Sequence, residues 1–258
     1  MPKFAANLTM LFTEVTFLDR FRLAAQAGFR GVEYPFPYDY STEKLALALR
    51  TNDLQQVLHN LPAGDWAAGE RGIACLPQHR QEFREGVELA VEYARALNCP
   101  RLNCLAGIQP SDLSDAEARV VFIDNLKFAA ACLAEADLEL LIEPINTRDI
   151  PGFYLHHTAQ AVEIIKEVAA PNLRLQYDIY HMQIMEGDLA ATLERYQHRI
   201  GHIQLADNPG RHEPGTGEIN YPFLFERLDA LGYAGWIGCE YLPTGDTQAG
   251  LEWFTPYQ

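Results

Sequence analysis

The chain has 258 residues, of which 48% are hydrophobic and 21% charged, a composition typical of a folded globular protein. Asp and Glu total 35 against 20 Lys and Arg, so the formal net charge is -15. This charge repels phosphate backbones and anionic lipid surfaces, which argues against nucleic-acid and membrane partners. The five cysteines are odd in number and form no Cys-x-x-Cys pair, and no secretory leader or membrane-spanning run occurs. We therefore expect a cytoplasmic protein without disulfides or a zinc–thiolate site.

A short β-prone run followed by a longer helical pattern recurs eight times. Strands are expected at Phe4–Met10, Gly31–Pro35, Leu54–Asn60, Arg101–Gly107, Leu138–Ile145, Leu173–Tyr180, Gly201–Asp207 and Gly235–Leu242. Helices are expected near 17–28, 41–51, 81–97, 114–136, 157–170, 188–199 and 221–231, with a short last one from Thr247.

Eight strand–helix units in a chain of this length predict a (β/α)8 TIM barrel that takes in residues 1–258 as one domain. The alternative is an open doubly wound sheet. Such a sheet usually carries a glycine-rich phosphate-binding turn after its first strand, and Asn7–Met10 is not such a turn.

Four consecutive strands end in an oxygen-bearing side chain that alternation points into the barrel. These residues are Glu143, Asp178, Gln204 and Glu240. They would meet at the carboxyl ends of the strands, where the active sites of such barrels lie.

Three carboxylates at one mouth repel one another unless protons, Arg or Lys partners, or a divalent cation neutralise them. Each acid taken singly could instead be half of a buried ion pair, with Arg101 or Arg174 as the partner. Four strands in succession favour a metal site, and oxygen donors without cysteine or histidine favour Mg²⁺ or Mn²⁺.

Four more residues are expected to bind substrate. His181 follows Asp178 at the strand end and could donate a hydrogen bond, whereas Arg211 lies in the next mouth loop and would suit a substrate carboxylate. Either could instead be an ordinary surface-loop residue. Glu33 and His59 end the inward phases of the second and third strands, and could line the pocket or bind each other.

Six segments together resemble the hydroxypyruvate isomerase family, one of the xylose-isomerase-like barrels. They are LHNLPAGDW at 58–66, IEPIN at 142–146, QYDIYHMQ at 176–183, GHIQ at 201–204, HEPGTGEINY at 212–221 and GCEY at 238–241. The resemblance covers essentially the whole chain. It implies that Glu143, Asp178, Gln204 and Glu240 hold the metal, and that Glu143 and Glu240 are the proton donor and acceptor.

The resemblance further implies reversible isomerisation of hydroxypyruvate and 2-hydroxy-3-oxopropanoate (tartronate semialdehyde). Proton transfer through an enediolate is the expected route, and a hydride shift is the alternative. The 2-oxo-tetronate isomerases share the barrel and many of the motifs, but the segment 58–66 favours the hydroxypyruvate branch. Related ketose epimerases have a histidine where Gln204 stands, which separates the chain from them.

Two readings from other classes stand beside the isomerase. Metal-dependent nucleases that repair abasic DNA use the same kind of barrel, but the net charge of -15 argues against them. A non-catalytic module that binds sugar acids would need the metal ligands without the proton-transfer pair. The expected partner is a small hydroxy or oxo acid, and the supply of aromatic residues favours a homo-oligomer.

Overall fold

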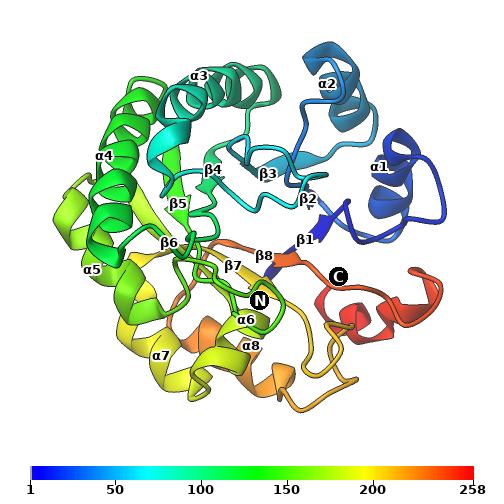
Figure 1. Ribbon diagram of the computed structural model, residues 1–258. Coiled ribbons are helices and arrows are strands. Elements are labelled where there is room, and N and C mark those ends of the chain that lie inside the picture. Colours follow the sequence, from blue (N-terminus) through cyan, green and yellow to red (C-terminus); the bar gives the residue numbers. More distant parts are fainter. Residues whose placement is uncertain (1) are drawn as a thin grey trace.

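The computed structural model describes residues 2–258, in which eight parallel strands close into a barrel (Figure 1). The strands are β1 (Lys3–Asn7), β2 (Gly31–Glu33), β3 (Gln55–Asn60), β4 (Arg101–Cys104), β5 (Glu139–Ile142), β6 (Leu173–Asp178), β7 (Ile200–Leu205) and β8 (Trp236–Cys239). Each strand pairs with the next along the chain, and β1 pairs with β8 to close the barrel. The predicted TIM barrel is confirmed.

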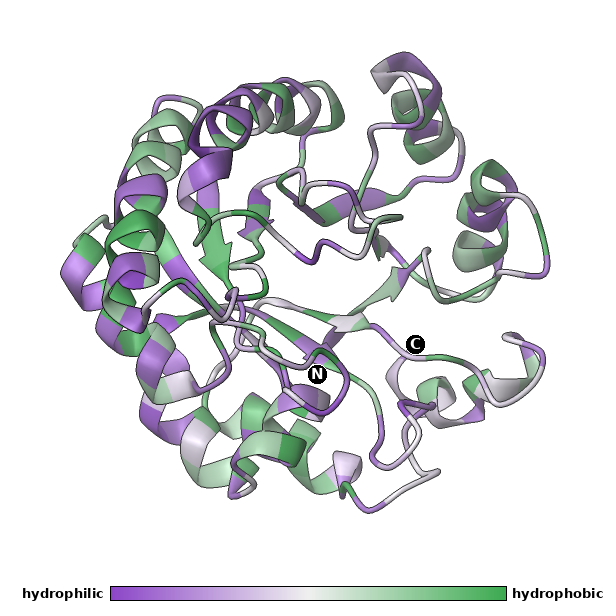
Figure 2. Ribbon diagram, in the orientation of Figure 1, coloured by the Kyte–Doolittle hydropathy of each residue, from purple (hydrophilic) through white to green (hydrophobic). Residues whose placement is uncertain are grey.

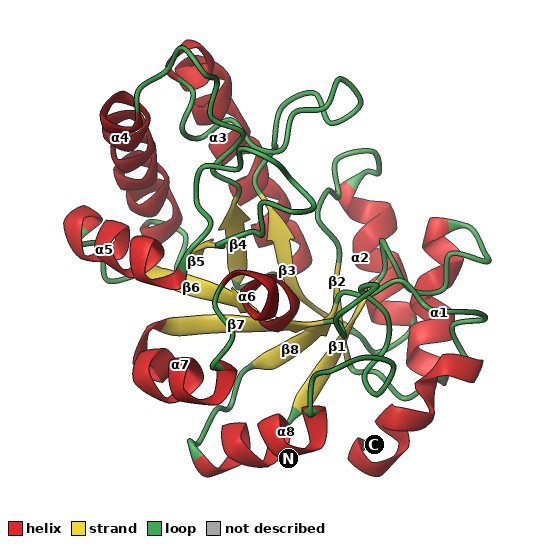
Figure 3. Cartoon of the chain, turned by 60° about the horizontal axis from the view of Figure 1, so that its bottom comes forward, coloured by secondary structure: helices red, strands yellow, loops and turns green. Residues whose placement is uncertain are grey.

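Seven helices within residues 2–258 form a ring outside the strands (Figures 1 and 3): α1 (Phe17–Gln26), α2 (Thr42–Thr51), α3 (Arg80–Leu97), α4 (Asp115–Ala134), α5 (Thr158–Val168), α7 (Leu189–Tyr196) and α8 (Tyr221–Ala230). The short helix α6 (Ile179–Met185) lies inside this ring, over the strands in Figure 3. Short 3₁₀ segments are η1 (Pro77–His79), η2 (Gln197–Arg199) and η3 (Ala249–Tyr257). Hydrophobic and hydrophilic residues alternate around the outer helices (Figure 2), as expected for helices with one face against a sheet.

All eight strands occur where the sequence predicts them, but most end earlier than expected. The strand expected to continue to Tyr180 is wrong at its end, because α6 begins at Ile179. The carboxylate of Asp178 accepts the backbone N–H groups of Tyr180 and His181 and so caps this helix. A side-chain cap thus turns the chain away from the sheet immediately after β6.

Alternation along the strands separates two packing layers. Leu141 points into the barrel and packs in a small inner cluster with Ala5, Val57 and Leu58, beside Trp236. Its neighbours Leu140 and Ile142 belong to the large core between strands and helices. The predicted inward phase of β5 is therefore confirmed, and it places Glu143 above Leu141 at the mouth.

The amino-terminal end of the barrel holds the arginines that were alternative partners for the mouth acids. Arg101 pairs with Glu139 at 2.8 Å, and Arg174 lies 3.9 Å from the other oxygen of Glu139. Because Glu139 begins β5 and Glu143 follows its end, neither arginine is paired with a mouth carboxylate.

All five cysteines are free. Within residues 2–258, no helix has both the length and the apolar character needed to cross a membrane.

Replacing Leu141 by alanine tests the inner cluster. Leu141 is fully buried, so the Leu141→Ala change is expected to lower the free energy of unfolding by about 2–5 kcal/mol. Leu47→Ala, at a residue 58% exposed on α2, is the control and should cost less than about 0.5 kcal/mol. Urea denaturation measures both values. Equal losses in the two variants would show that the inner cluster does not stabilise the barrel.

Candidate active site and metal centre

Three acids from three strand ends meet at the mouth of the barrel. Asp178 ends β6, Glu143 follows β5 by one residue and Glu240 follows β8 by one residue. All three are largely buried. Glu143, Gln204 and Glu240 border one cavity of about 20 Å³, roughly the room for one water molecule or ion.

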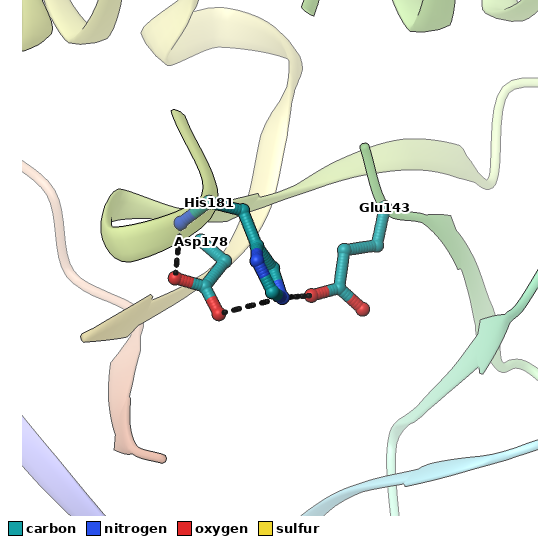
Figure 4. A group of neighbouring side chains, drawn as sticks. All are labelled: Glu143, Asp178 and His181. Atoms are coloured by element: carbon teal, nitrogen blue, oxygen red, sulfur yellow. Dashed lines mark hydrogen bonds and ion pairs between the residues drawn. The ribbon is translucent and has the colours of Figure 1, made fainter. Parts of the chain in front are cut away.

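His181 joins two of these acids (Figure 4). Its Nε2 lies 3.6 Å from Asp178 Oδ2 and 3.9 Å from Glu143 Oε1. One ligand atom each from Glu143, Asp178 and His181 lies within 4.8 Å of the other two, a spacing that a metal ion could bridge. The sequence placed His181 in the substrate pocket and not among the metal ligands.

Burial and like charge together disfavour ionisation of the mouth acids. Burial raises the pKa of Glu143 well above its usual range, and the charges of Glu240 and Asp178 raise it further. Burial also raises the pKa of Asp178, and it raises that of Glu240 to about 7. A bound cation would reverse this preference, because it favours the ionised form of each ligand.

Arg211 is the guanidinium closest to these acids. Its Nη2 donates to Glu240 Oε2 at 2.5 Å, and its guanidinium carbon lies 5.3 Å from the ring centre of Tyr180. Burial opposes the charged form, but the charges of Glu240, Asp178 and Glu143 raise the pKa of Arg211. One cation thus faces three acids, which leaves the site short of positive charge.

The loop between β7 and α8 carries Arg211. Asp207, fully buried, accepts backbone N–H groups from Asn208, Gly215, Gly217 and Ile219. Arg211 has a φ of 58°, in the left-handed region. The carboxylate of Asp207 therefore fixes the loop conformation that aims Arg211 at the mouth.

Two asparagines hold the two glutamates in the same way. Asn7, at the end of β1, donates to Glu240 Oε1 at 3.1 Å, and Asn103, on β4, donates to Glu143 Oε2 at 2.9 Å. Each glutamate thus has one oxygen hydrogen-bonded to an asparagine amide. The second oxygen of Glu240 accepts from Arg211, and the second oxygen of Glu143 faces His181.

Gln204 and Glu33 belong to a buried network below the mouth. Gln204 donates to Glu33 at 2.7 Å and accepts from Gln176 at 2.6 Å. Glu33 also lies 2.7 Å from Nε2 of His202 and accepts from Asn7, which links it to Glu240. The structure brings Glu33 to the cavity that the sequence expects it to line.

His59 is placed differently. Of the two alternatives that the sequence leaves open, binding to Glu33 is not seen, because Glu33 is bonded to Asn7, His202 and Gln204. His59 borders the mouth cavity, but its ring Nδ1 lies 3.1 Å from the Gln56 amide. Burial lowers the pKa of His59 to about 3, so the ring is neutral.

A shift of register explains the position of His59. Val32 of β2 pairs with Gln56, but the next residue, Glu33, pairs with Leu58. The extra residue in β3 shifts the alternation by one, so Leu58 joins the inner cluster where the sequence expects His59.

Sequence reasoning missed several residues of the site, namely Asn7, Asn103, Asn146 and His202. Asn7 and Asn103 lie in the inward phases of β1 and β4, so the alternation argument that identified Gln204 would find them if it were extended to these two strands. His202 precedes Gln204 by two residues, so the same alternation directs it into the barrel, but a lone histidine on a strand carries no further signal of its role. Asn146 follows β5 in a loop, where no periodicity indicates its direction.

The donor set suits a hard divalent cation. Asp178 Oδ2 is buried and has no hydrogen-bond partner among the described residues, and it faces Glu143 across a short distance. An unpartnered carboxylate oxygen in such a place is costly without a cation. Gln204 already uses both ends of its amide on Gln176 and Glu33, so it would join as a ligand only through the second lone pair of its oxygen.

Comparisons with known proteins agree with this fold. A family model described as a xylose isomerase-like TIM barrel matches residues 21–257. The chain is 55% identical to hydroxypyruvate isomerase of Escherichia coli over 100% of both chains. It is 51% identical to 2-oxo-tetronate isomerase of Cupriavidus necator, over 100% of this chain and 99% of the relative. A solved Brucella melitensis protein described as an AP endonuclease of family 2 is 49% identical, with a TM-score of 0.98 over 100% of both chains.

The pair of Arg211 and Glu240 generates a stability prediction. In metal-free protein, Arg211→Met removes the cation beside a largely buried carboxylate and should lower the free energy of unfolding by about 2 kcal/mol. Adding Glu240→Gln should restore at least half of that loss, because the carboxylate is then gone. Urea denaturation with a chelator present measures the cycle.

The exposed pair of Arg80 and Asp124 provides the control, and Arg80→Met should cost under about 0.5 kcal/mol. If the single and double variants at the mouth lost the same stability, Arg211 would not be compensating the charge of Glu240.

Proposed function

The chain belongs to the xylose isomerase-like TIM barrel family, and we propose that it interconverts hydroxypyruvate and 2-hydroxy-3-oxopropanoate (tartronate semialdehyde). Its full-length relatives include a hydroxypyruvate isomerase and a 2-oxo-tetronate isomerase, so the chain is an isomerase. The observation that carries the proposal is the pair of buried glutamates, Glu143 and Glu240, each held through one oxygen by an asparagine.

The proposed reaction moves one proton between neighbouring carbons. A carboxylate removes a proton from C3 of hydroxypyruvate, and the electrons of that C–H bond form the double bond of an enediolate. A proton is then returned to C2, while the C3 hydroxyl loses its hydrogen and the C2 oxygen gains one. Atoms and electrons balance without an oxidant, a reductant or a second substrate.

Glu143 and Glu240 are the proposed acid and base. Burial raises the pKa of both groups when no cation is present, and a bound cation would favour the carboxylate form that takes the proton. Asn103 and Asn7 hold one oxygen of Glu143 and Glu240, respectively. The second oxygen of each faces a residue proposed to bind substrate, His181 for Glu143 and Arg211 for Glu240, so both oxygens lie where the substrate would be held.

His181 and Arg211 are proposed to bind the substrate oxygens. Arg211 would hold the carboxylate that both three-carbon acids carry, since a guanidinium presents two parallel donors to a carboxylate. His181 would donate from Nε2 to the substrate carbonyl oxygen, where negative charge develops. Glu33 would not touch the substrate itself but would hold Asn7, Gln204 and His202 in position. His59 is bonded to Gln56, and no contact between His59 and the substrate is proposed.

The cofactor proposed is Mg²⁺ or Mn²⁺, held by Glu143, Asp178, Gln204 and Glu240. When bound, it supplies Lewis-acid polarisation of the substrate carbonyl and balances the charge of the acids. The buried, unpartnered Asp178 Oδ2 supports this proposal.

The remaining expectations belong to the same proposal. Five free cysteines suit a reducing cytoplasm. The exposed indole of Trp66, which packs against Phe36, supports a homo-oligomer. The four-carbon 2-oxo-tetronate is the competing substrate, because the two isomerase relatives differ by only four points of identity.

A turnover assay tests the function. Metal-loaded protein is incubated with hydroxypyruvate, and tartronate semialdehyde is followed by NMR, with 2-oxo-tetronate and abasic duplex DNA in parallel. Wild type should convert hydroxypyruvate, and Glu143→Gln and Glu240→Gln should each lower kcat by roughly 10²–10⁴-fold. Chelation should abolish turnover, and Mn²⁺ or Mg²⁺ should restore it.

Glu139→Gln, at the opposite end of β5, is the matched control and should keep its activity. If only 2-oxo-tetronate were converted, the chain would still be an isomerase, but hydroxypyruvate would not be its substrate. Cleavage of abasic DNA without isomerisation would overturn the proposal, as would undiminished turnover in both glutamine variants. Binding of the acids without turnover would favour the non-catalytic module.

A further inference from the structure

His181 occupies a position from which its ring could act in two incompatible ways. A neutral imidazole has one nitrogen that donates and one that accepts. If Nε2 carries no hydrogen, it can bind a cation together with Glu143 and Asp178, whose oxygens lie 3.9 and 3.6 Å away. If Nε2 carries the hydrogen, it can only donate. The partner of Nδ1 decides between these two states.

That partner is the side-chain amide of Asn146, which lies in the loop after β5 and is fully buried. Its Nδ2 lies 2.7 Å from His181 Nδ1. A backbone N–H group, which can only donate, fixes the orientation of the Asn146 amide. This N–H group belongs to Asp149, and its nitrogen lies 2.8 Å from Asn146 Oδ1.

The other end of the amide is fixed as well. Asn146 Nδ2 lies 3.0 Å from Asp149 Oδ2, which also accepts from the hydroxyl of Tyr180 at 2.9 Å. The two hydrogens of the amide are thus directed to a carboxylate and to the imidazole ring. Turning the amide over would set its oxygen against the Asp149 carboxylate and its NH₂ against a backbone N–H.

We propose that Asn146 fixes the hydrogen of His181 on Nε2, which makes His181 a donor at the barrel mouth and keeps it out of the metal's ligand set. Nδ1 faces an N–H donor at 2.7 Å and must accept, so the ring hydrogen lies on Nε2. Nε2 in turn faces two carboxylate oxygens, which suit an N–H group and not a second lone pair.

Two consequences follow for the site. The ligands left to a cation are oxygens, which favours Mg²⁺ or Mn²⁺ over ions that prefer imidazole. The Nε2–H group is available to an oxygen of the substrate, a role that rests on the proposed isomerase function. Asn146 is then a positioning residue, which acts on the reaction through His181.

The position of the hydrogen is measured directly by long-range ¹H–¹⁵N correlation on metal-free, ¹⁵N-labelled protein without substrate. In wild type, His181 should show a protonated-type ¹⁵N shift at Nε2 and an unprotonated-type shift at Nδ1, with signals assigned by their loss in His181→Gln. His156 is an internal reference. Its Nδ1 lies 3.0 Å from the backbone oxygen of Tyr154, so it should show the opposite pattern.

A double variant reverses the polarity of the network. Asn146→Asp combined with Asp149→Asn exchanges the amide and the carboxylate, leaves the formal charge unchanged and can keep every hydrogen bond. The carboxylate at position 146 then accepts from the ring, so the hydrogen of His181 should move to Nδ1, while His156 is unaffected. Co²⁺ should bind the double variant at least roughly tenfold more tightly than wild type, because Nε2 is free to ligate it.

Either of two spectra would overturn the inference: a wild-type His181 with its hydrogen on Nδ1, or a double variant that keeps it on Nε2. If the double variant does not fold, Asn146→Ala removes the donor alone and should give a mixture of both tautomers, and a single Nε2–H form there would also contradict the inference. Absence of turnover on both acids would instead reject the proposed function and leave the tautomer as measured.

Discussion

The structure depends on keeping three carboxyl groups together in a mouth that excludes most of the water. Two unit charges 4 Å apart repel by about 4 kcal/mol at an effective dielectric constant of 20. The charges of Asp178 and Glu240 disfavour ionisation of Glu143, and one guanidinium, that of Arg211, faces the three acids. The remaining charge must be met by protons or by a divalent cation. The same electrostatic constraint therefore favours both carboxyl groups that can carry a proton and a site that binds a cation.

The surrounding elements are arranged to meet that constraint. Asn7 and Asn103 come from the strands next to the two glutamates and orient them, and the loop folded around Asp207 brings Arg211 to the mouth. The side-chain amide of Asn146 contacts Nδ1 of His181 and orients the ring. Asn7, Asn103 and Arg211 donate hydrogen bonds to the glutamate oxygens, so these oxygens are held in place by donors. Such preorganisation is the condition for stabilising charge that develops on a substrate.

Much of this architecture could be predicted from the sequence, because side chains alternate along a strand and active sites of this barrel lie at the strand ends. That argument placed Glu143, Asp178 and Glu240 at one mouth. It failed for His59, where an extra residue in β3 shifts the alternation, and for the end of β6, where the Asp178 cap starts a helix. The contact between Arg211 and Glu240 depends on a loop held by Asp207, and no periodicity encodes it.

The central claim is that the mouth acids hold one divalent cation through oxygen ligands. A crystal of the protein soaked in Mn²⁺, with diffraction data collected at the manganese absorption edge, tests it most directly. The account predicts one anomalous peak at the mouth, within about 2.3 Å of oxygens from Glu143, Asp178, Gln204 and Glu240, with His181 Nε2 outside the coordination sphere. No peak at the mouth, or a peak ligated by His181 Nε2, would contradict it.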